Sequence, residues 1–439
     1  MPFATHFRIA TLQTSLTFFS LAAKMTTYDV FQQTFALSLA ANALQDTKAT
    51  LADLQAAIEG LVPLYIAVEA GKGLKGWEVV WGPTVWKHPL KPDETDEGTG
   101  PDNTWYIAHK SGVQFPDGTY DTYVVAIAGT ASTFDWVQED FAVNNVVDFK
   151  QFSSNFTSPP SPAGSVNDNL NSYISYGTAG AIYTLLNTFA PQSAQSPGNT
   201  IVQFLSTVPK TSRVIFTGHS LGGALSPTLA LTLQVSKSLQ NVLTYPTAGP
   251  SPGNKNFASL FASFNPIKKP GGNPLPWQGW NTNLFNTRDV VPQAWSTDPV
   301  ANPKQNLYNI VGIYGVLNSV LRIFVQFLVY IGIGRADGSQ VQYTPLQGSS
   351  FTQPPPPTPS TLPQFIATVR DQHVNQYEIQ LNVFPPKASL VDLYQKHGLQ
   401  SKTYEEYIVT LPFFELYKVV LQQQKEAELN AAETKKTLW

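Results

Sequence analysis

The stretch "RVIFTGHSLGGALSPTLAL", residues 213–231, decides the fold that we expect for this chain. Its first five residues favour a β-strand, and the residues from Leu221 onwards favour a helix. Ser220 stands at the junction, two residues after Gly218 and two before Gly222, which is the spacing of a sharp strand-to-helix turn. Such a turn exposes the serine and directs the free N–H groups of the following helix at it.

A Gly-x-Ser-x-Gly sequence alone arises by chance in a noticeable minority of chains of this length, and glycine-rich turns are common. The strand before Ser220 and the helix after it supply the context that a catalytic serine requires. A serine hydroxyl becomes a nucleophile only where it is exposed and a neighbour takes its proton. We therefore interpret Ser220 as a candidate nucleophile.

Composition excludes several classes of protein. The chain has 439 residues, and 42% of them are hydrophobic, which is enough for a large core. The formal net charge is −3 and there is no basic block, so nucleic acid is not an expected partner. Cysteine is absent, which excludes a thiol nucleophile and disulfides. The six histidines show no metal-ligand spacing, so we expect neither a metal nor a cofactor.

The two ends of the chain differ in pattern from the middle. Residues 1–28 contain no acidic residue, and their apolar stretch is followed by small residues near Ala22 and Ala23. Both features are typical of a secretory signal peptide. A mis-called start before Met25 is the alternative, so the localisation stays open between secreted and intracellular. Residues 401–439 predict a helical tail whose last part is charged.

The segment between these ends, residues 29–400, predicts one α/β domain. Helical spacing occurs over 29–70 and 172–189, and strand-like runs occur at 77–86, 104–110 and 122–129. Helices that alternate with apolar strands predict a mostly parallel central sheet covered by helices on both faces.

A hydrolytic serine needs a histidine as base and a carboxylate that orients it, in the chain order Ser, Asp, His. Only His373 and His397 follow Ser220. Asp289 directly follows a strand-like run, from which an acid can reach the histidine. Three other acids lie between Ser220 and His373 and are less favoured as the orienting group, because they lie in loop-like sequence or too close to His373: Asp298, Asp337 and Asp371. A turn-forming Asp289 and a surface or helix-capping His373 are the alternatives.

The chain resembles the class-three (filamentous-fungal-type) lipases of the α/β-hydrolase fold. The resemblance covers about residues 120–380, and the matching segments follow one another in the family's order. They are "VVAIAGTASTFDW" (124–136), "FTGHSLGGALSPTLAL" (216–231), "VLTYPTAGPSPGNKNFA" (242–258), "FNTRDVVPQ" (285–293) and "HVNQY" (373–377), where an aromatic often stands four residues after the histidine.

This resemblance implies that Ser220 is the nucleophile, Asp289 the acid and His373 the base. It also implies an oxyanion hole made by the N–H groups of Leu221 and Thr130, and the Thr130 hydroxyl could donate as well. The elbow around the nucleophile then consists of Gly218, His219 and Gly222.

Four features depart from the family pattern, one of which is the tail beyond about residue 400, which has no family counterpart. Ala128 stands where the family usually has an arginine. The predicted lid, about residues 131–171, is longer than a minimal lid. Asp289 and His373 are 84 residues apart, and the interval contains the strongly apolar insertion 307–334.

The insertion is long enough to suggest a membrane span. Polar side chains recur every four residues along one stripe of a helix: Asn318, Arg322, Gln326 and Tyr330. We expect a helix packed on the core with this stripe in water. The alternative is a helix that contacts the acyl-binding cleft or a lipid surface. An integral membrane span is not expected, because an arginine near its centre is costly.

The sequence therefore predicts a serine ester hydrolase for lipid-like esters, most simply a triacylglycerol lipase that works through an acyl-enzyme on Ser220. A carboxylesterase, a phospholipase A1 or a feruloyl-type esterase fits the same frame, because a fold does not fix the substrate. An inactive lipid-binding relative is the non-enzymatic alternative. The expected partner is a lipid or ester substrate at a lipid–water interface, and nothing indicates an oligomeric state.

Overall fold

The computed structural model describes residues 27–45, 47–90, 92, 94–129, 142–386 and 400–401. Nearly all of the predicted signal peptide, the tail from residue 402, His397, Thr130 and residues 131–141 of the predicted lid lie outside these residues.

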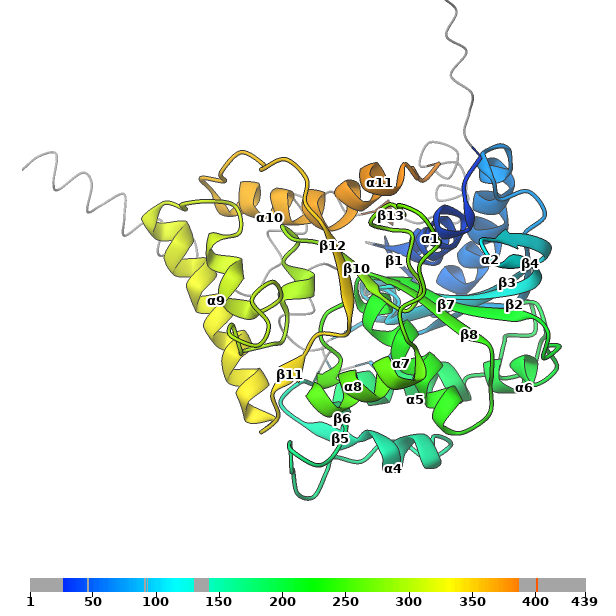
Figure 1. The fold of residues 1–439 in the computed structure, drawn as a ribbon, viewed down its shortest axis with the longest axis horizontal. Coiled ribbons are helices and arrows are strands. Elements are labelled where there is room, and N and C mark those ends of the chain that lie inside the picture. Colours follow the sequence, from blue (N-terminus) through cyan, green and yellow to red (C-terminus); the bar gives the residue numbers. More distant parts are fainter. Residues whose placement is uncertain are drawn as a thin grey trace, which may run out of the picture.

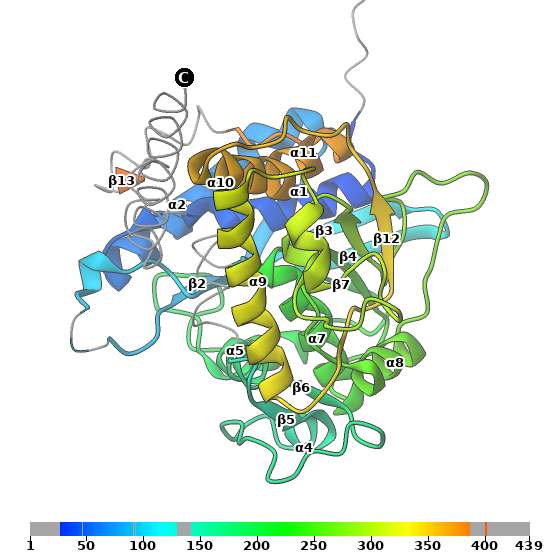
Figure 2. The same cartoon turned by 90° about the vertical axis from the view of Figure 1, so that its left-hand side faces the viewer.

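A seven-stranded sheet forms the centre, in the order β12-β10-β8-β7-β4-β3-β2 (Figures 1 and 2). Its strands are β2 (Glu78–Trp86), β3 (Asn103–Phe115), β4 (Gly118–Ile127), β7 (Arg213–His219), β8 (Val242–Thr247), β10 (Asn283–Asn286) and β12 (Gly348–Phe351). The strands from β4 to β12 run parallel, whereas β2, β3 and β4 form an antiparallel meander. The sheet is thus mostly parallel, as the sequence predicts.

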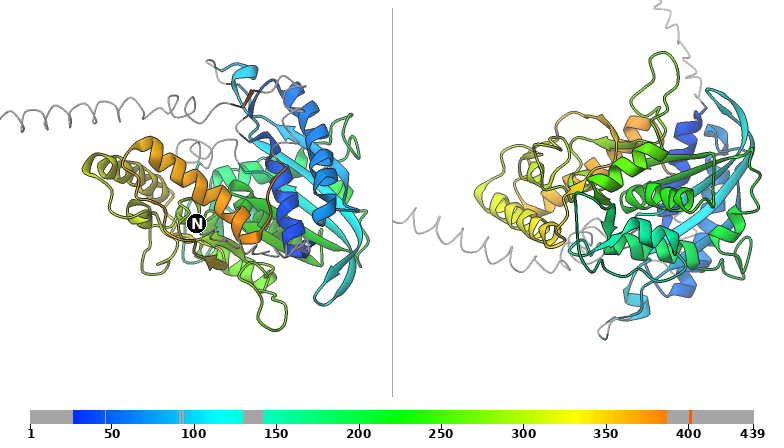
Figure 3. Two further views of the ribbon diagram at one scale, coloured as in Figure 1. Left: turned by 90° about the horizontal axis from the view of Figure 1, so that it is seen from above. Right: turned by 60° about the horizontal axis from the view of Figure 1, so that its bottom comes forward.

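Helices cover both faces of this sheet (Figure 3). They are α1 (Val30–Ala41), α2 (Leu51–Val68), α4 (Phe149–Ser154), α5 (Tyr176–Asn187), α6 (Ile201–Leu205), α7 (Leu221–Val235), α8 (Lys255–Phe264), α9 (Ser319–Gly338), α10 (Leu362–Arg370) and α11 (Gln376–Leu381). Short 3₁₀ turns join them, namely η1 (Asn42–Leu44), η2 (Glu69–Lys72), η3 (Asp96–Gly98), η4 (Val291–Gln293) and η5 (Leu307–Gly312), and a π-helical turn, η6 (Asp371–Asn375), links α10 to α11.

The two faces of strand β7 contribute to two different hydrophobic cores. Val214 and Phe216 face the core built with α5, α7, α9 and α10, whereas Ile215 faces the core built with α1 and α2. Successive side chains of a strand point to opposite faces, so a strand covered on both sides must be apolar throughout. This is why residues 214–216 are all hydrophobic.

Two smaller sheets complete the described chain. One has the order β11-β9-β6-β5 and is antiparallel, with β5 (Val146–Asp148), β6 (Tyr173–Ser175), β9 (Gly253–Asn254) and β11 (Tyr343–Thr344). The other pairs β1 (Thr47–Lys48) with β13 (Gln400–Ser401). A hydrogen bond from Gln32 Nε2 to the Leu381 carbonyl (2.7 Å) also joins the two ends of the domain.

Several predicted elements differ from those observed. Residues 29–70 form two helices, because the chain turns through η1 and β1 after Ala41. Residues 173–175 form β6, and α5 begins only at Tyr176, where the Ser175 side chain caps it. The long helix of the insertion begins at Ser319, and the first residues of the insertion form η5 instead.

Candidate active site

Ser220 lies at the tight turn between β7 and α7. Its backbone has φ +62° and ψ −125°, a conformation that is rare for a residue with a side chain. The Ser220 N–H donates to the Thr247 carbonyl (3.0 Å), which holds the turn. A Cβ at Gly218 would lie 2.4 Å from the Gly222 carbonyl oxygen, and one at Gly222 would lie 2.2 Å from the Ile127 carbonyl oxygen. Only glycine fits at both positions.

The structure brings together the three residues that the sequence singles out. His373 Nε2 lies 2.8 Å from Ser220 Oγ, and His373 Nδ1 lies 2.8 Å from Asp289 Oδ2. Asp289 and His373 are buried, whereas Ser220 is half-buried. When Nδ1 donates to the carboxylate, Nε2 is free to accept the serine proton. The arrangement can therefore generate a serine nucleophile.

Asp289 follows β10, and its carboxylate accepts two further hydrogen bonds. The Val291 N–H donates to Oδ1 (2.9 Å), and the Tyr377 hydroxyl donates to Oδ2 (2.8 Å). The Asn286 N–H in turn donates to the Tyr377 oxygen (2.9 Å). Burial and the charge of Asp289 hold the pKa of Tyr377 well above 10, so the hydroxyl keeps its proton. The sequence pattern noted the aromatic at this position but not this contact.

His373 lies in the π-helical turn η6. An inserted π-turn shifts the side chains that follow it, and such turns are frequent at functional sites. The Asp371 carboxylate accepts from Asn375 Nδ2 (3.1 Å) and Gln376 Nε2 (2.9 Å), so it braces the turn. The carboxylates of Asp298 and Asp337 also accept hydrogen bonds from other groups. Asp298 accepts from the N–H groups of Val300 and Ala301, and Asp337 accepts from the Thr297 hydroxyl.

His219, the residue before the serine, is buried beside His373. The ring centroids lie 4.7 Å apart at an interplanar angle of 35°, and His219 Nδ1 lies 3.0 Å from Thr247 Oγ1. Burial first, and the adjacent His373 second, lower the pKa of His219 well below 6.5. His219 therefore stays a neutral ring.

Candidate oxyanion donors lie at the start of α7 and the end of β4. Leu221 is the first residue of α7, where an N–H has no acceptor within the helix. A Cβ at Gly129 would lie 2.9 Å from Ser220 Cβ, so the end of β4 passes directly beside the serine. The Gly129 N–H donates to Asn42 Oδ1 (2.8 Å), a contact from η1 that no local pattern indicated. Thr130, the second predicted donor, lies outside the described residues.

Part of this chain is similar in sequence to a known family of proteins. Residues 124–298 match the family model of the lipases of class 3. Over these residues the chain is similar to the class 3 lipases. The match contains the serine elbow and the aspartate segment, and it confirms the resemblance that the sequence motifs carry.

Solved structures extend the likeness to the fold of the whole domain. The M37 lipase aligns with a TM-score of 0.61 and 23% identity, and the alignment covers 84% of this chain and 99% of that chain. The chain therefore has the α/β-hydrolase fold. Lower structural similarity is found to the native Rhizomucor miehei lipase propeptide complex (19% identity, 60% and 62% covered, TM-score 0.35) and to the mono- and diacylglycerol lipase from Aspergillus oryzae (16%, 60% and 72%, 0.31). No curated protein matches.

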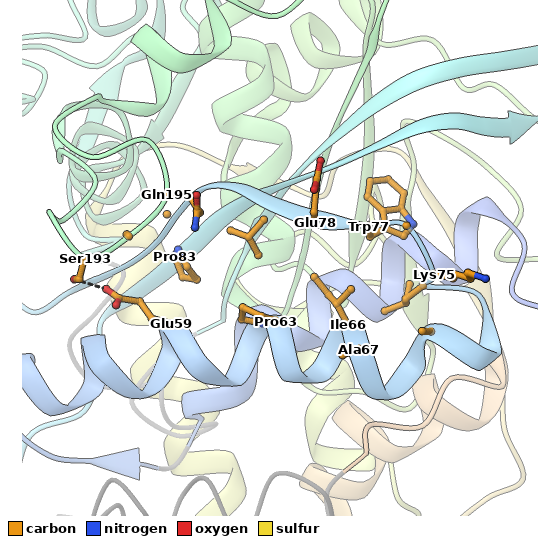
Figure 4. A pocket seen from close by; sticks show the side chains of 16 residues that line it. Glu59, Pro63, Ile66, Ala67, Lys75, Trp77, Glu78, Pro83, Ser193 and Gln195 are labelled. Atoms are coloured by element: carbon orange, nitrogen blue, oxygen red, sulfur yellow. Dashed lines mark hydrogen bonds between the residues drawn. The ribbon is translucent and has the colours of Figure 1, made fainter.

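Away from Ser220, Asp289 and His373, the described residues offer little competing chemistry. They contain no group of three or more acidic or histidine side chains that could hold a metal. A cavity of about 410 Å³ lies between α2 and β2, and a hydrogen bond from Ser193 Oγ to Glu59 (2.7 Å) crosses one end of it (Figure 4). None of the three candidate catalytic residues lines this cavity.

Two helices among the described residues are long and apolar enough to cross a membrane, Leu51–Lys72 and Ser319–Gly338. Length and composition are the only grounds for this, and core helices satisfy the same test. In both, 39% of the most apolar window is buried inside the protein.

Proposed function

We propose that this protein is a serine hydrolase that cleaves lipid-like esters, most simply triacylglycerols, through an acyl-enzyme on Ser220. The observation that carries the proposal is the unbroken chain of 2.8 Å contacts from Ser220 Oγ through the His373 ring to Asp289 Oδ2. The match to the class 3 lipases supports the class of reaction, and this geometry supports the roles proposed for the three residues.

In the first half-reaction, Ser220 Oγ attacks the ester carbonyl carbon while His373 Nε2 takes the hydroxyl proton. The charge that forms on the carbonyl oxygen is stabilised by N–H donors, of which Leu221 provides one and Thr130 is the proposed second. Collapse of the tetrahedral intermediate breaks the bond to the leaving alcohol, and His373 returns the proton to that alcohol. Asp289 holds the imidazolium throughout.

In the second half-reaction, water attacks the acyl-enzyme while His373 takes its proton. The tetrahedral intermediate then releases the carboxylic acid and returns the proton to Ser220 Oγ. No cofactor enters either step. Water and the ester are the only co-reactants.

Replacement of the nucleophile tests the proposal. We expect Ser220→Ala to lower kcat on tributyrin and on p-nitrophenyl butyrate by at least about 10³-fold, because the covalent route is lost. The folded structure should persist, since the half-exposed hydroxyl supports little packing. A fluorophosphonate probe should label the natural protein at Ser220 and leave the variant unlabelled.

A matched control exists on the same helix. Ser226 of α7 is buried, and its Oγ has no hydrogen-bond partner among the described residues. Ser226→Ala therefore removes a serine hydroxyl without removing a hydrogen bond, and we expect full activity and full labelling. Normal activity of Ser220→Ala, or labelling at another residue, would contradict the proposal.

A further inference from the structure

A small cavity with an entirely apolar lining lies between α9, α10 and the segment that follows Asp289. Its volume is about 40 Å³. The side chains around it come from the aspartate segment, from η5, from α9 and from α10: Val290, Trp295, Leu307, Ile310, Val325, Leu328, Val329, Gly332, Phe365 and Val369. No charged side chain is among them.

The position of this cavity links it to the catalytic residues. Val290 directly follows Asp289, and Val369 precedes His373 by four residues. One wall is thus formed by the segments that carry the acid and the base. Helix α9 forms the opposite wall, and the start of α9 lies beside α10 in both views (Figures 1 and 2). Helix α9 lies outside the residues matched by the family model.

The chemistry of the lining selects the occupant. A cavity without polar partners does not hold water well, and an unfilled one is a packing defect that lowers stability. About three water-sized groups fit in this volume, whereas a cavity that binds benzene measures about 150 Å³. A linear hydrocarbon end fits the space, and a ring does not.

We propose that this cavity receives the terminal carbons of the acyl chain of the ester, so that α9 sets the acyl-chain length that the enzyme prefers. The inference rests on the proposed function, because it assumes that an acyl chain is bound next to Asp289 and His373. It goes further by assigning the end of that chain to a wall built from the 307–334 insertion.

Gly332 gives a direct way to fill the cavity. A Cβ at this position would meet Leu307 Cδ1 at 3.6 Å and Trp295 Cζ3 at 3.8 Å, which are ordinary contacts. A Cβ at this position therefore fits, and Gly332→Val adds two methyl carbons beyond it toward the cavity lining. Gly334 on the same helix is the matched control, because a Cβ there meets no atom within 4 Å and the residue is exposed.

The experiment measures kcat/KM on p-nitrophenyl esters from acetate to palmitate for the natural protein, Gly332→Val and Gly334→Val. We expect Gly332→Val to keep its activity on acetate and to lose about fourfold on longer esters for each methylene displaced from the cavity. Gly334→Val should keep the natural profile. Gly332→Ala, a milder change, should give an intermediate loss if the valine variant folds poorly.

Two outcomes overturn the inference. An unchanged chain-length profile for Gly332→Val, together with a raised melting temperature, means that the cavity is only a packing void. An equal loss on all esters, acetate included, means that the change disturbs the catalytic residues rather than chain binding.

A binding measurement separates failure of this inference from failure of the proposed function. Trp295 lines the cavity, so a bromine-labelled fatty acid bound there should quench its fluorescence in the inactive Ser220→Ala protein. The difference between Ser220→Ala and Ser220→Ala with Trp295→Phe isolates this signal from the other tryptophans. The quenching should vanish with Gly332→Val and persist with Gly334→Val. Persistence in both would overturn the inference whatever the enzyme hydrolyses.

Discussion

At the residue scale, Tyr377 acts on the reaction through Asp289. Its hydroxyl donates to the same carboxylate oxygen that His373 contacts. Removing this donor leaves the carboxylate with one hydrogen bond fewer, so Asp289 orients the His373 ring less firmly. In Tyr377→Phe we expect kcat to fall by about tenfold and KM to change little, because the weakened orientation acts on the chemical step and not on ester binding.

The measurement is kcat and KM on a soluble ester, together with the melting temperature. Tyr65→Phe is the matched control, because Tyr65 is also buried and its hydroxyl has no partner among the described residues. A purely structural contribution of Tyr377 would lower the melting temperature and leave kcat of the folded enzyme unchanged.

His219 makes stability depend on pH. Burial lowers its pKa well below 6.5, so below pH 6.5 the unfolded chain binds a proton there that the folded chain does not bind. The free energy of unfolding should therefore fall by about 1.4 kcal/mol for each pH unit below 6.5, until the folded pKa is reached. In His219→Asn we expect this part of the decline to vanish. Urea unfolding at pH 6.5 and at pH 5 measures the change in the free energy of unfolding between the two pH values. An equal decrease in the natural protein and in His219→Asn would contradict the prediction.

The same scale shows where sequence reasoning stops. Ser220, Asp289 and His373 could be found because each has a local signal: a glycine frame, a strand end, and the required order along the chain. Asn42 and Tyr377 form their contacts with Gly129 and Asp289 over 87 and 88 residues of chain. The sequence around Asn42 and around Tyr377 does not indicate that these side chains bind partners so far away along the chain.

At the scale of elements, α9 fits the predicted stripe only in part. Arg322, Gln326 and Tyr330 are exposed as predicted, and Asn318 caps the helix. Ile323 is exposed as well (57%), because the water-facing side is wider than one stripe of four-residue spacing. The pattern thus predicted the face but not its width, which depends on how closely the neighbouring elements approach.

Stability measurements on α9 test this arrangement. Phe324 is buried and Ile323, next to it in sequence, is exposed. We expect Phe324→Ala to lower the free energy of unfolding by about 3 kcal/mol, because it leaves a cavity in the core. Ile323→Ala should change it by less than about 0.5 kcal/mol. Equal effects in chemical denaturation would mean that the helix packs with a different face inward.

The π-helical turn η6 marks another limit of sequence patterns. It inserts one residue into a helical run that otherwise continues from Leu362 to Leu381. The sequence "RDQHVNQY" shows no glycine or proline to announce the change. Asn375 donates to the Asp371 carboxylate within the turn, and Asn286 Nδ2, at the end of β10, donates to the Gln372 carbonyl. The turn is therefore held in part by a tertiary contact.

At the scale of the whole molecule, the first described helix belongs to the core that supports the site. Helix α1 buries Phe31, Phe35 and Leu37 against the sheet, and the Tyr106 hydroxyl donates to the Leu37 carbonyl (2.7 Å). Phe35 also packs edge-on against the ring of His219. The residues before the family match are therefore part of the same folded unit.

Truncation tests this dependence. A chain that begins at Met25 retains all of these contacts, so we expect it to keep its melting temperature and its esterase activity. A chain that begins at Gln45 lacks α1 and should be aggregated or unfolded, because one core loses its cover. Circular dichroism, size-exclusion chromatography and ester turnover distinguish the two, and a soluble, active chain from Gln45 would contradict the prediction.

The hydrogen bond between Gln32 and Leu381 has a consequence for synthesis in the cell. Its two partners are separated by 349 residues, and ribosomes add about 5–20 residues each second. The amino-terminal helix therefore emerges roughly 20 to 70 s before the last partner it contacts. In the later part of that interval the nascent chain has Ser220 but not His373, and the apolar face of α1 lacks some of its partners. Chaperone occupancy in selective ribosome profiling should peak in this interval and fall once Leu381 has left the exit tunnel.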